Sequence, residues 1–457
     1  QMCIRDRSEG SPAAEAGLQA GDIIMEINGK DMAQGDRTPN ELTSYVSDNL
    51  RGDPGTTCVL KLERPTADST YIPMELKITR GTIRTNPVPY YGMVDKNIGY
   101  IAISTFAIEG CSKDIKKALI ELKQQGATSI VLDLRGNGGG LLSEAVNVVN
   151  FFVPKGKEIV VTKGKIKQAG STYKTSNEPI DMEIPLTVLV DGATASAAEI
   201  VSGSLQDLDR AVIVGNRTYG KGLVQVPREL PYNSSMKVTT AKYYIPSGRC
   251  IQAIDYAKRN ADGSVARIPD SLTTVFHTAA GREVRDGGGI RPDVEVKAER
   301  FPNIMFYLLN DDMIFDYATQ YCIKHPNIGE VKDFSVTDAD YDDFKQMLKK
   351  RNFTYDRQSE KSLKNLKEIA EFEGYMEGAS EEFAALEKKL THNLDHELNR
   401  FSKQIRKAIA EEIVKRHYFQ RGVILERMKD DANLTKAIET LKDKEGYTKI
   451  LSVPADK

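Results

Sequence analysis

The chain has 457 residues, and at an ordinary domain size of about 100–200 residues this predicts two to four domains. Its 63 Lys and Arg side chains nearly balance 65 Asp and Glu side chains, and the net charge of −2 gives no electrostatic reason to expect a nucleic acid or an anionic membrane surface as a partner. Hydrophobic residues make up 40% of the chain, which is enough for folded cores, and no apolar run of about 18 residues predicts a transmembrane helix.

The first residues differ from the rest, because residues 1–7 lack both the apolar core of a signal peptide and any periodicity. We expect this segment to be foreign or artefactual, and the natural N-terminus and any export signal to be missing. Residues 8–82 predict a small mixed domain. Its expected elements are a strand over Ile23–Ile27, a hairpin turn at Asn28 and Gly29, a helix over Glu41–Leu50 and a strand over Thr57–Leu62.

Residues 83–299 predict an α/β domain, because apolar strands alternate with helices as in a partly parallel sheet. In such a sheet, functional residues gather in the loops that follow the carboxyl ends of the strands. The expected strands are Ile98–Ile103, Ser129–Leu134, Leu186–Val190 and Ala211–Val214. The expected helices are Asp114–Gln125, Leu141–Phe152 and Ala195–Leu208.

Residues 300–457 change in character, since glycine becomes scarce and a helical spacing of apolar residues recurs. We expect an all-helical domain here, and it carries no motif that can be attached to chemistry. The expected helices are Phe301–Tyr317, Asp340–Lys350, Ser359–Phe372, Glu381–Lys415 and Leu434–Leu441.

A serine, Ser196, lies where a buried strand is expected to end and a helix to begin. A serine at a helix N-terminus can present its hydroxyl beside free backbone N–H groups, which can hold a developing oxyanion. Such a nucleophile needs a base, and the glycine-flanked Lys221 is a better candidate than His277, the only histidine in the first two domains. The lysine would have to be uncharged, which desolvation can bring about. If the segment after Lys221 is extended, Gln225 shares its face and can orient the amine.

A glycine-rich turn follows another expected strand, in the sequence Asp133-Leu-Arg-Gly-Asn-Gly-Gly-Gly140. The backbone N–H groups of such a turn before a helix can bind an anion. This anion is either a dinucleotide phosphate or the oxyanion beside Ser196, although Leu141 stands where a dinucleotide-binding motif needs its last glycine. The residues alone also allow plain structural roles, namely a tight turn, an N-cap serine and a surface lysine.

Three other patterns carry no chemistry in our interpretation. Residues 215–221 match the GxxxxGK phosphate loop, but Gly222 replaces the required Ser or Thr, and a strand pattern follows. His392 and His396 share a helix face, but the glutamate of a zinc-protease motif does not accompany them. The five cysteines are scattered and form no CxxC pair. We therefore expect no metal and no cofactor.

Taken together, the sequence resembles the C-terminal processing peptidases, also called tail-specific proteases, from Gly10 to Asp293. The stretch Gly10–Gly29 is similar to the second half of a PDZ domain. One block departs mildly from the family, since Ala198 stands where members usually have serine. The specific blocks of the second domain are Ile98–Phe106, Asp133–Gly139, Ala193–Ile200, Tyr219–Gln225 and Tyr244–Arg249.

The resemblance implies an α/β (α+β) fold. Residues 8–82 would be a partial PDZ domain, residues 83–299 a ClpP/crotonase-like α/β protease core, and residues 300–457 an all-helical C-terminal domain. The implied activity is that of a serine endopeptidase that cleaves protein substrates near their C-termini.

The same resemblance assigns roles to single residues. Ser196 is the nucleophile, Lys221 is the general base, and Gln225 positions the lysine. The backbone N–H groups of Ala197 and Gly139 form the oxyanion hole. Glu199 stands at a position that is commonly acidic in the family, and the resemblance defines its role less closely.

The resemblance also implies partners and a location. The PDZ unit would capture a free C-terminal carboxylate by strand addition beside the helix Glu41–Leu50. Its carboxylate-binding loop precedes this stretch in the family and is absent here, so we expect weak or lost tail binding. C-terminal helices support a homodimer in some members, and bacterial members act in the periplasm or at the outer side of the membrane.

Two other functional classes stay open from the sequence. A catalytically silent PDZ/peptidase-fold binding protein would not react with a serine-directed acylating probe. A nucleotide-binding α/β protein would be protected by ATP or NAD in a melting assay, and Leu141 and Gly222 argue against this class.

Overall fold

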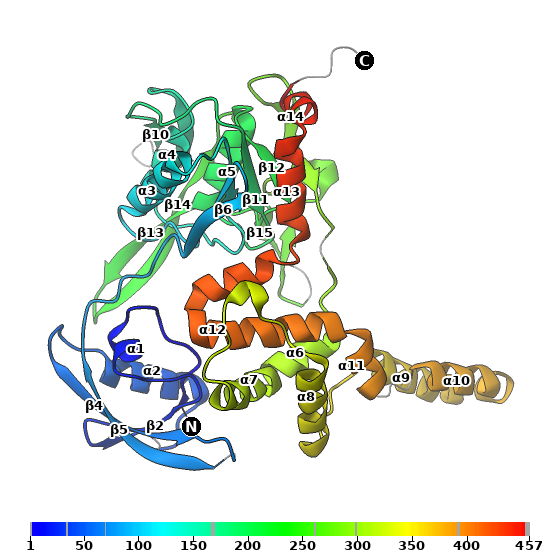
Figure 1. The fold of residues 1–457 in the computed structure, drawn as a ribbon. Coiled ribbons are helices and arrows are strands. Elements are labelled where there is room, and N and C mark those ends of the chain that lie inside the picture. The colour runs from blue at the N-terminus through cyan, green and yellow to red at the C-terminus, as the bar shows by residue number, and fades with distance from the viewer. Residues whose placement is uncertain are drawn as a thin grey trace. The chain divides into compact units, whose positions relative to one another are not determined.

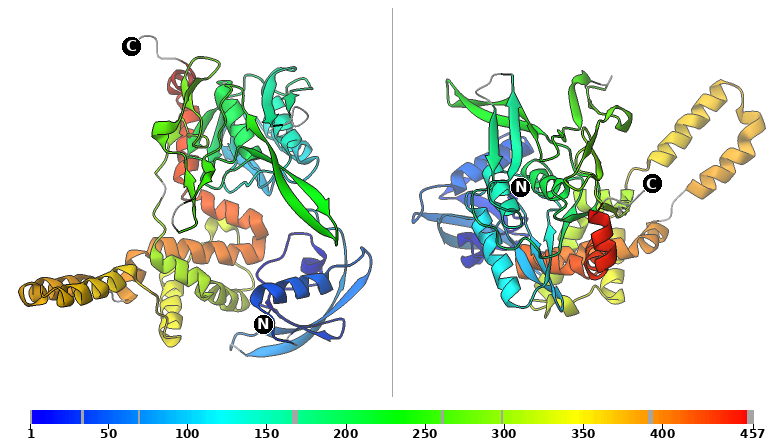
Figure 2. Two further views of the ribbon diagram at one scale, coloured as in Figure 1. Left: turned by 180° about the vertical axis from the view of Figure 1, so that it is seen from behind. Right: turned by 90° about the horizontal axis from the view of Figure 1, so that it is seen from above.

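The computed structural model describes residues 2–32, 35–68, 70–165, 170–259, 262–297, 299–390 and 394–452, and Figures 1 and 2 show its ribbon. Contacts within the chain divide it into two compact units. The first unit consists of Gln1–Arg84 and Glu299–Lys429, and the second consists of Thr85–Ala298 and Asp430–Lys457.

A small antiparallel sheet with two helices begins the first unit. Its strands run in the order β1-β2-β4-β5, and β3 pairs with β2. These elements are β1 (Met2–Cys3), α1 (Pro12–Glu15), β2 (Ile23–Ile27), β3 (Lys30–Asp31), α2 (Pro39–Leu50), β4 (Thr57–Pro65) and β5 (Tyr71–Thr79). Apolar side chains such as Leu60 of β4 and Val46 of α2 form its core. Strand β1, from the segment expected to be foreign, pairs with β2 at the edge of this sheet.

The rest of the first unit is helical and has a core of its own. Helices α9 and α10 contact each other and form a hairpin, which the right-hand view of Figure 2 shows. The helices are α6 (Asn303–Asn310), α7 (Met313–Lys324), α8 (Asp338–Lys350), α9 (Gln358–Phe372), α10 (Met376–Leu390), α11 (Leu394–Arg400) and α12 (Ser402–Met428).

Two of the expected helices are wrong in extent. The expected helix Phe301–Tyr317 is interrupted at Asp312, whose φ of +62° cannot continue a right-handed helix and which precedes α7. The expected helix Glu381–Lys415 is divided among α10, α11 and α12. His392, which the sequence pairs with His396, lies outside the described residues.

A six-stranded sheet organises the second unit, in the order β19-β12-β11-β8-β7-β6. Its neighbouring strands pair in parallel, except that β6 is antiparallel to β7. Helices α3, α4 and α5 connect these strands and pack with them in one apolar core, which makes this unit the α/β domain that the sequence predicts. The elements are β6 (Tyr90–Asp95), β7 (Ile98–Ala102), α3 (Cys111–Gln124), β8 (Ser129–Asp133), α4 (Leu142–Asn150), β11 (Leu186–Val190), α5 (Ala197–Asp207), β12 (Val212–Gly215) and β19 (Val294–Glu295).

The helices α13 (Ala432–Lys442) and α14 (Lys444–Leu451) belong to this second unit, although the sequence prediction placed residues 300–457 in one helical domain. Helix α13 packs against β8, β11 and β12 (Figure 1). At its start, Asp431 forms a bidentate ion pair with Arg135, with N–O distances of 2.7 and 3.0 Å. The buried apolar side chains belong to α13, and they include Leu434, Ala437 and Leu441.

A four-stranded antiparallel sheet, in the order β10-β9-β14-β13, also belongs to the second unit. Two hairpins pair β15 with β16 and β17 with β18. These strands are β9 (Glu158–Gly164), β10 (Ser171–Lys174), β13 (Leu223–Leu230), β14 (Ser234–Tyr244), β15 (Ile254–Arg259), β16 (Val265–Arg267), β17 (Val275–His277) and β18 (Glu283–Arg285). Within the described ranges of both units, every helix is too short or too polar to cross a membrane.

Candidate active site

Ser196 stands in an unusual backbone conformation at the turn between β11 and α5. Its φ of +57° and ψ of −117° match a turn position that glycine normally fills, and a residue with a Cβ is strained there. The strand ends at Val190 and the helix begins at Ala197, so the serine lies at the helix N-terminus as the sequence predicts. A sharp strand-to-helix turn of this kind can expose a serine hydroxyl at the end of a sheet.

Glu199 is buried in α5, and its carboxylate holds the main chain around both predicted catalytic residues. Oε2 accepts hydrogen bonds from Ser196 N–H at 2.8 Å and from Lys221 N–H at 2.9 Å. Oε1 accepts from Gly220 N–H at 2.7 Å and from Thr218 Oγ1 at 2.5 Å. Burial raises the pKa of this carboxyl above its ordinary value, and the four hydrogen bonds oppose that shift. The main chains of the serine and the lysine therefore lie next to each other.

Tyr243 of β14 makes a second link between the same two residues. Its hydroxyl is buried and donates to the carbonyl oxygen of Ser196 at 3.2 Å and to that of Lys221. Burial raises the pKa of Tyr243 well above its ordinary value, so the hydroxyl remains a donor. Glu199 and Tyr243 together fix the geometry of the two main-chain segments from both their N–H and their C=O sides.

The side chain of Lys221 is half-buried. In the part of the chain that the structure describes, no carboxylate forms an ion pair with its ammonium group, and no hydrogen bond joins it to the Ser196 hydroxyl. The nearby oxygens of Glu199 are occupied by backbone N–H groups and by Thr218. The main chain of Lys221 thus lies beside that of Ser196, and among the described residues its amine has no partner acid.

The glycine-rich turn after β8 lies directly against Ser196. Its buried Asn137 donates from the side chain to Ile103 O at 2.8 Å and accepts from Gly139 N–H at 2.9 Å. A Cβ built on Gly139 would lie 2.8 Å from Ala197 N and 2.8 Å from Ser196 Cβ. The missing side chain therefore leaves space in front of the Ala197 N–H.

These contacts bear differently on the two predicted oxyanion donors. The N–H of Ala197 has no hydrogen-bond partner among the described residues, as an oxyanion donor requires. The N–H of Gly139 donates within its own turn to Asn137, so its role as a second donor stays a prediction.

A carboxylate that sequence reasoning did not single out joins the two turns. Asp191 Oδ1 accepts hydrogen bonds from Gly136, Ala193 and Thr194 N–H groups, each at 3.0 Å. An Asp directly after a buried strand is a signal for a turn that its own side chain closes. Its bond to Gly136 could not be foreseen, because it depends on β8 and β11 being parallel neighbours.

Gln225 is the predicted residue that the structure does not bring into contact with the lysine. It is exposed on β13, opposite Thr239, and the described residues hold no hydrogen bond between its side chain and Lys221. Its positioning role stays a prediction. His277, the alternative base, is exposed at the end of β17. Among the described residues, no three side chains are grouped in a way that could hold a metal ion.

Three family models match successive parts of the chain. Residues 4–64 match the PDZ domain, residues 97–258 match Peptidase family S41, and residues 304–441 match "Probable PDZ-protease, C-terminal helical domain". Ser196 and Lys221 both fall within the S41 match.

The chain is similar to curated proteases over about half of its length. It is 38% identical over 252 residues to the carboxy-terminal-processing protease of Bartonella bacilliformis, and 39% identical over 240 residues to the carboxyl-terminal-processing protease of Picosynechococcus sp.. These matches cover 54% and 52% of the chain and 55% of each relative, so the chain spans about half the length of the curated relatives it matches. Among solved structures, the photosystem II D1 C-terminal processing protease is 29% identical with a TM-score of 0.36, over 66% of this chain and 69% of that chain.

Proposed function

We propose that the chain is a C-terminal processing peptidase, a serine endopeptidase that cleaves protein substrates near their C-termini. Ser196 is the nucleophile and Lys221 is the general base. The observation that carries the proposal is the strained turn at Ser196, joined through one Glu199 oxygen to the main chain of Lys221. A serine that only caps a helix adopts relaxed extended angles, so strain here indicates a side chain needed for chemistry.

The reaction is an acyl transfer in two steps. Uncharged Lys221 takes the hydroxyl proton of Ser196 as its oxygen attacks the peptide carbonyl carbon, and an electron pair moves to the carbonyl oxygen. Ala197 N–H donates to this oxyanion together with an N–H of the glycine-rich turn, for which Gly139 is our candidate. The amine then leaves with the proton from Lys221, and water, deprotonated by the same lysine, hydrolyses the acyl-enzyme.

Several features around the lysine support its role as a base. A lysine acts as a general base only in its uncharged form. Lys221 is half-buried, and among the described residues no carboxylate forms an ion pair with its amine. A peptide substrate bound at Ser196 would also cover the amine. Gln225 is proposed to approach and orient the amine in that substrate-bound state.

A serine-directed acylating probe tests the nucleophile directly. We expect the purified chain to be labelled and Ser196→Ala to remain unlabelled, while Ser235→Ala, an exposed serine of β14, is labelled like the wild type. Lys221→Ala should abolish peptide cleavage, and Lys237→Ala, an exposed lysine of the same strand, should keep it. If Ser196→Ala is labelled as strongly as the wild type, or cleaves substrate at nearly the wild-type rate, the assignment is rejected. An unlabelled wild type would favour the silent binding protein instead.

The PDZ domain is proposed to assist by binding the free C-terminus of the substrate. Its helix α2, which is proposed to line the peptide groove, begins at a capping box formed by Thr38 and Glu41 that stabilises its first turn. We expect this chain to bind weakly, at high peptide concentration only. Titration with paired peptides that end in a carboxylate or an amide measures the carboxylate contribution, and tight, carboxylate-dependent binding would contradict the expectation.

A homodimer through the helical C-terminal domain, residues 300–457, and an extracytoplasmic location complete the proposal. Light scattering of the purified chain tests the first, since a strictly monomeric mass removes it. Fractionation of the source cells tests the second, because a purely cytoplasmic signal would contradict it.

A further inference from the structure

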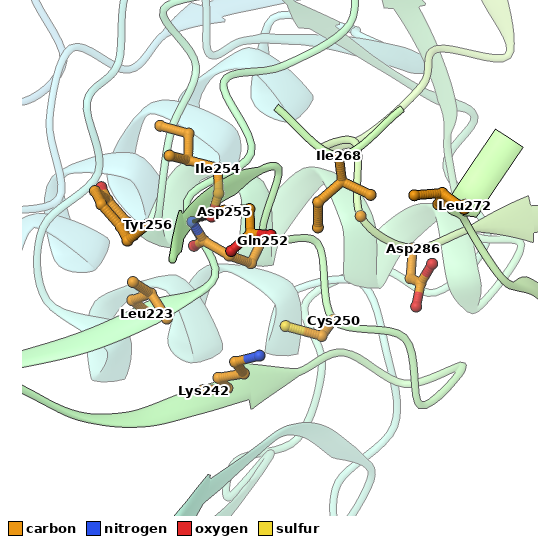
Figure 3. A pocket seen from close by; sticks show the side chains of 11 residues that line it. Leu223, Lys242, Cys250, Gln252, Ile254, Asp255, Tyr256, Ile268, Leu272 and Asp286 are labelled. Atoms are coloured by element: carbon orange, nitrogen blue, oxygen red, sulfur yellow. Dashed lines mark hydrogen bonds between the residues drawn. The ribbon is translucent and has the colours of Figure 1, made fainter. Parts of the chain in front are cut away.

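A cavity of about 350 Å³ lies in the second unit, and its lining includes Leu223, two residues after Lys221 (Figure 3). Its lining comes from three parts of the second unit. These are the β13–β14 hairpin, residues 250–256 with the first half of β15, and the stretches around residues 268–272 and 286–287. In Figure 3, Leu223 and Tyr256 lie at one end, and Leu272 and Asp286 lie at the other. The volume is at the lower end of the range for small-molecule sites, about 300–1,000 Å³.

The cavity wall is tied to the catalytic lysine by short contacts. Gln252, which lines the cavity, accepts a hydrogen bond from Gly222 N–H at 2.7 Å. A Cβ on Gly222 would lie 2.8 Å from Gln252 N, so these two backbone segments touch. One residue further along, Leu223 contributes its side chain to the cavity. The cavity lining therefore begins within two residues of Lys221, beside the segment that carries the proposed base.

Apolar side chains form most of the cavity lining, and two large ones are exposed to solvent. Leu223, Ile254 and Ile268 are half-buried within it, whereas Tyr256 is 55% exposed and Leu272 is 67% exposed at its mouth. Large apolar side chains gathered around an apolar hollow are typical of a surface that a ligand covers.

The charged groups at the rim do not favour a charged ligand. Lys242 contributes one positive charge, and Asp255 and Asp286 contribute negative charges. Asp286 Oδ1 accepts from Thr274 N–H at 2.7 Å, so this carboxylate already has a backbone partner. Because the rim carries charges of both signs and the lining is mainly apolar, the peptide group that fits this cavity best is an uncharged apolar side chain.

We propose that this cavity is a substrate subsite, which binds one large aliphatic or aromatic side chain of the peptide being cleaved and so sets a sequence preference. The inference rests on the proposed peptidase function. Burying such a side chain against Leu223, Ile254 and Ile268 strengthens binding of the reacting peptide, so the preference is measured in kcat/KM.

Two substitutions of exposed residues test the subsite without disturbing a core. A positional peptide library first identifies the substrate position at which wild type prefers Leu or Phe over Asp, by about 10–100-fold in kcat/KM. Tyr256→Arg places a cation at the end of the cavity away from Asp286, and should raise kcat/KM for the Asp peptide at that position alone. Leu272→Ser should lower kcat/KM for the Leu peptide at the same position by about 3–10-fold. A gain for the Asp peptide cannot arise from partial unfolding.

Met182→Arg is the matched control, since Met182 is exposed in the same unit but does not line the cavity. It should leave the whole preference profile unchanged. If the wild type is labelled by the acylating probe and cleaves peptides, but both cavity variants keep its profile, the subsite is overturned and the peptidase function stands. If the wild type is neither labelled nor active, both proposals fall together.

Discussion

The two turns at the candidate site both contain positive φ angles, which are strained for any residue with a Cβ. One turn places glycines at these positions, and the other places a serine there. The turn after β8 places positive φ values of 71°, 94° and 149° on Gly136, Gly139 and Gly140, where glycine is unstrained. The turn after β11 places a φ of +57° on Ser196, where a Cβ costs about 1–3 kcal/mol. Glycine would suit the second turn better for stability, which is consistent with the proposed role of the Ser196 hydroxyl.

The strained turn is sustained by hydrogen bonds from elements around it. Ser196 N–H donates to Glu199, and Ser196 O accepts from Tyr243. One residue earlier, Ala195 N–H donates to Asn137 O at 2.9 Å, which joins this turn to the glycine turn. Strained angles persist where surrounding contacts determine them more than once, and this turn has such contacts on both sides.

The largest expected effect comes from giving the glycine turn a side chain. In Gly139→Ala, a φ of +94° strains the new residue, and its Cβ would meet Ala197 N, the proposed oxyanion donor, at 2.8 Å. We expect kcat to fall by about 10²–10³-fold, which is the usual cost of losing one oxyanion donor. Steady-state kinetics with a chromogenic peptide measure this, and KM should change little.

Gly138→Ala is the matched control for that variant. A Cβ at this neighbouring position meets nothing within 4 Å, so kcat should stay close to the wild-type value. Thermal unfolding of both variants reports whether the fold is kept. If kcat fell equally in the two variants, the claim that catalysis needs open space in front of the Ala197 N–H would be wrong.

The second effect separates strain from chemistry at Ser196. Both Ser196→Gly and Ser196→Ala remove the hydroxyl and should be inactive, but only glycine relaxes the positive φ. We expect the free energy of unfolding of Ser196→Gly to exceed that of Ser196→Ala by about 1 kcal/mol, measured by denaturant titration. At exposed Ser235 of β14, the same pair should show the opposite order, because glycine weakens a relaxed strand. Equal stabilities at position 196 would mean that the turn is not strained.

The central strands could be predicted closely because they are buried on both faces. The bounds Leu186–Val190 agree with the observed β11, since a short apolar run between turn residues has few interpretations. The place of Ser196 at a helix start followed from the same pattern. The interruption at Asp312 could not be predicted, because apolar spacing continues on both sides of it and only its φ of +62° breaks the helix.

Contacts between distant segments could not be predicted from local patterns. Glu199 reaches Gly220 and Lys221 only because β12 is the neighbour of β11, so that the residues after β12 arrive beside the start of α5. The apolar spacing of α13 predicts a helix, but the same stripe would suit a partner helix or the face of a sheet. The strand alternation that placed Gln225 beside Lys221 says nothing about how far each side chain is exposed.

The smallest expected effect is the contribution of Glu199 to the pH dependence of the free energy of unfolding. Because its pKa is raised by burial, the folded state holds a proton over a pH window in which the unfolded state has lost it. The free energy of unfolding should therefore fall as pH rises from the ordinary glutamate value toward the raised one. One proton limits this slope to about 1.4 kcal/mol per pH unit.

Glu199→Gln removes the titrating group and should flatten this part of the stability profile, even though the amide also weakens the four hydrogen bonds at the turn. Glu229→Gln, at an exposed position of β13, should leave the slope as in the wild type. Unfolding free energies measured between pH 4 and pH 8 for the three proteins give the comparison. A wild-type slope that survives in Glu199→Gln would mean that another acid holds the proton, and that Glu199 stays ionised under its four donors throughout this range.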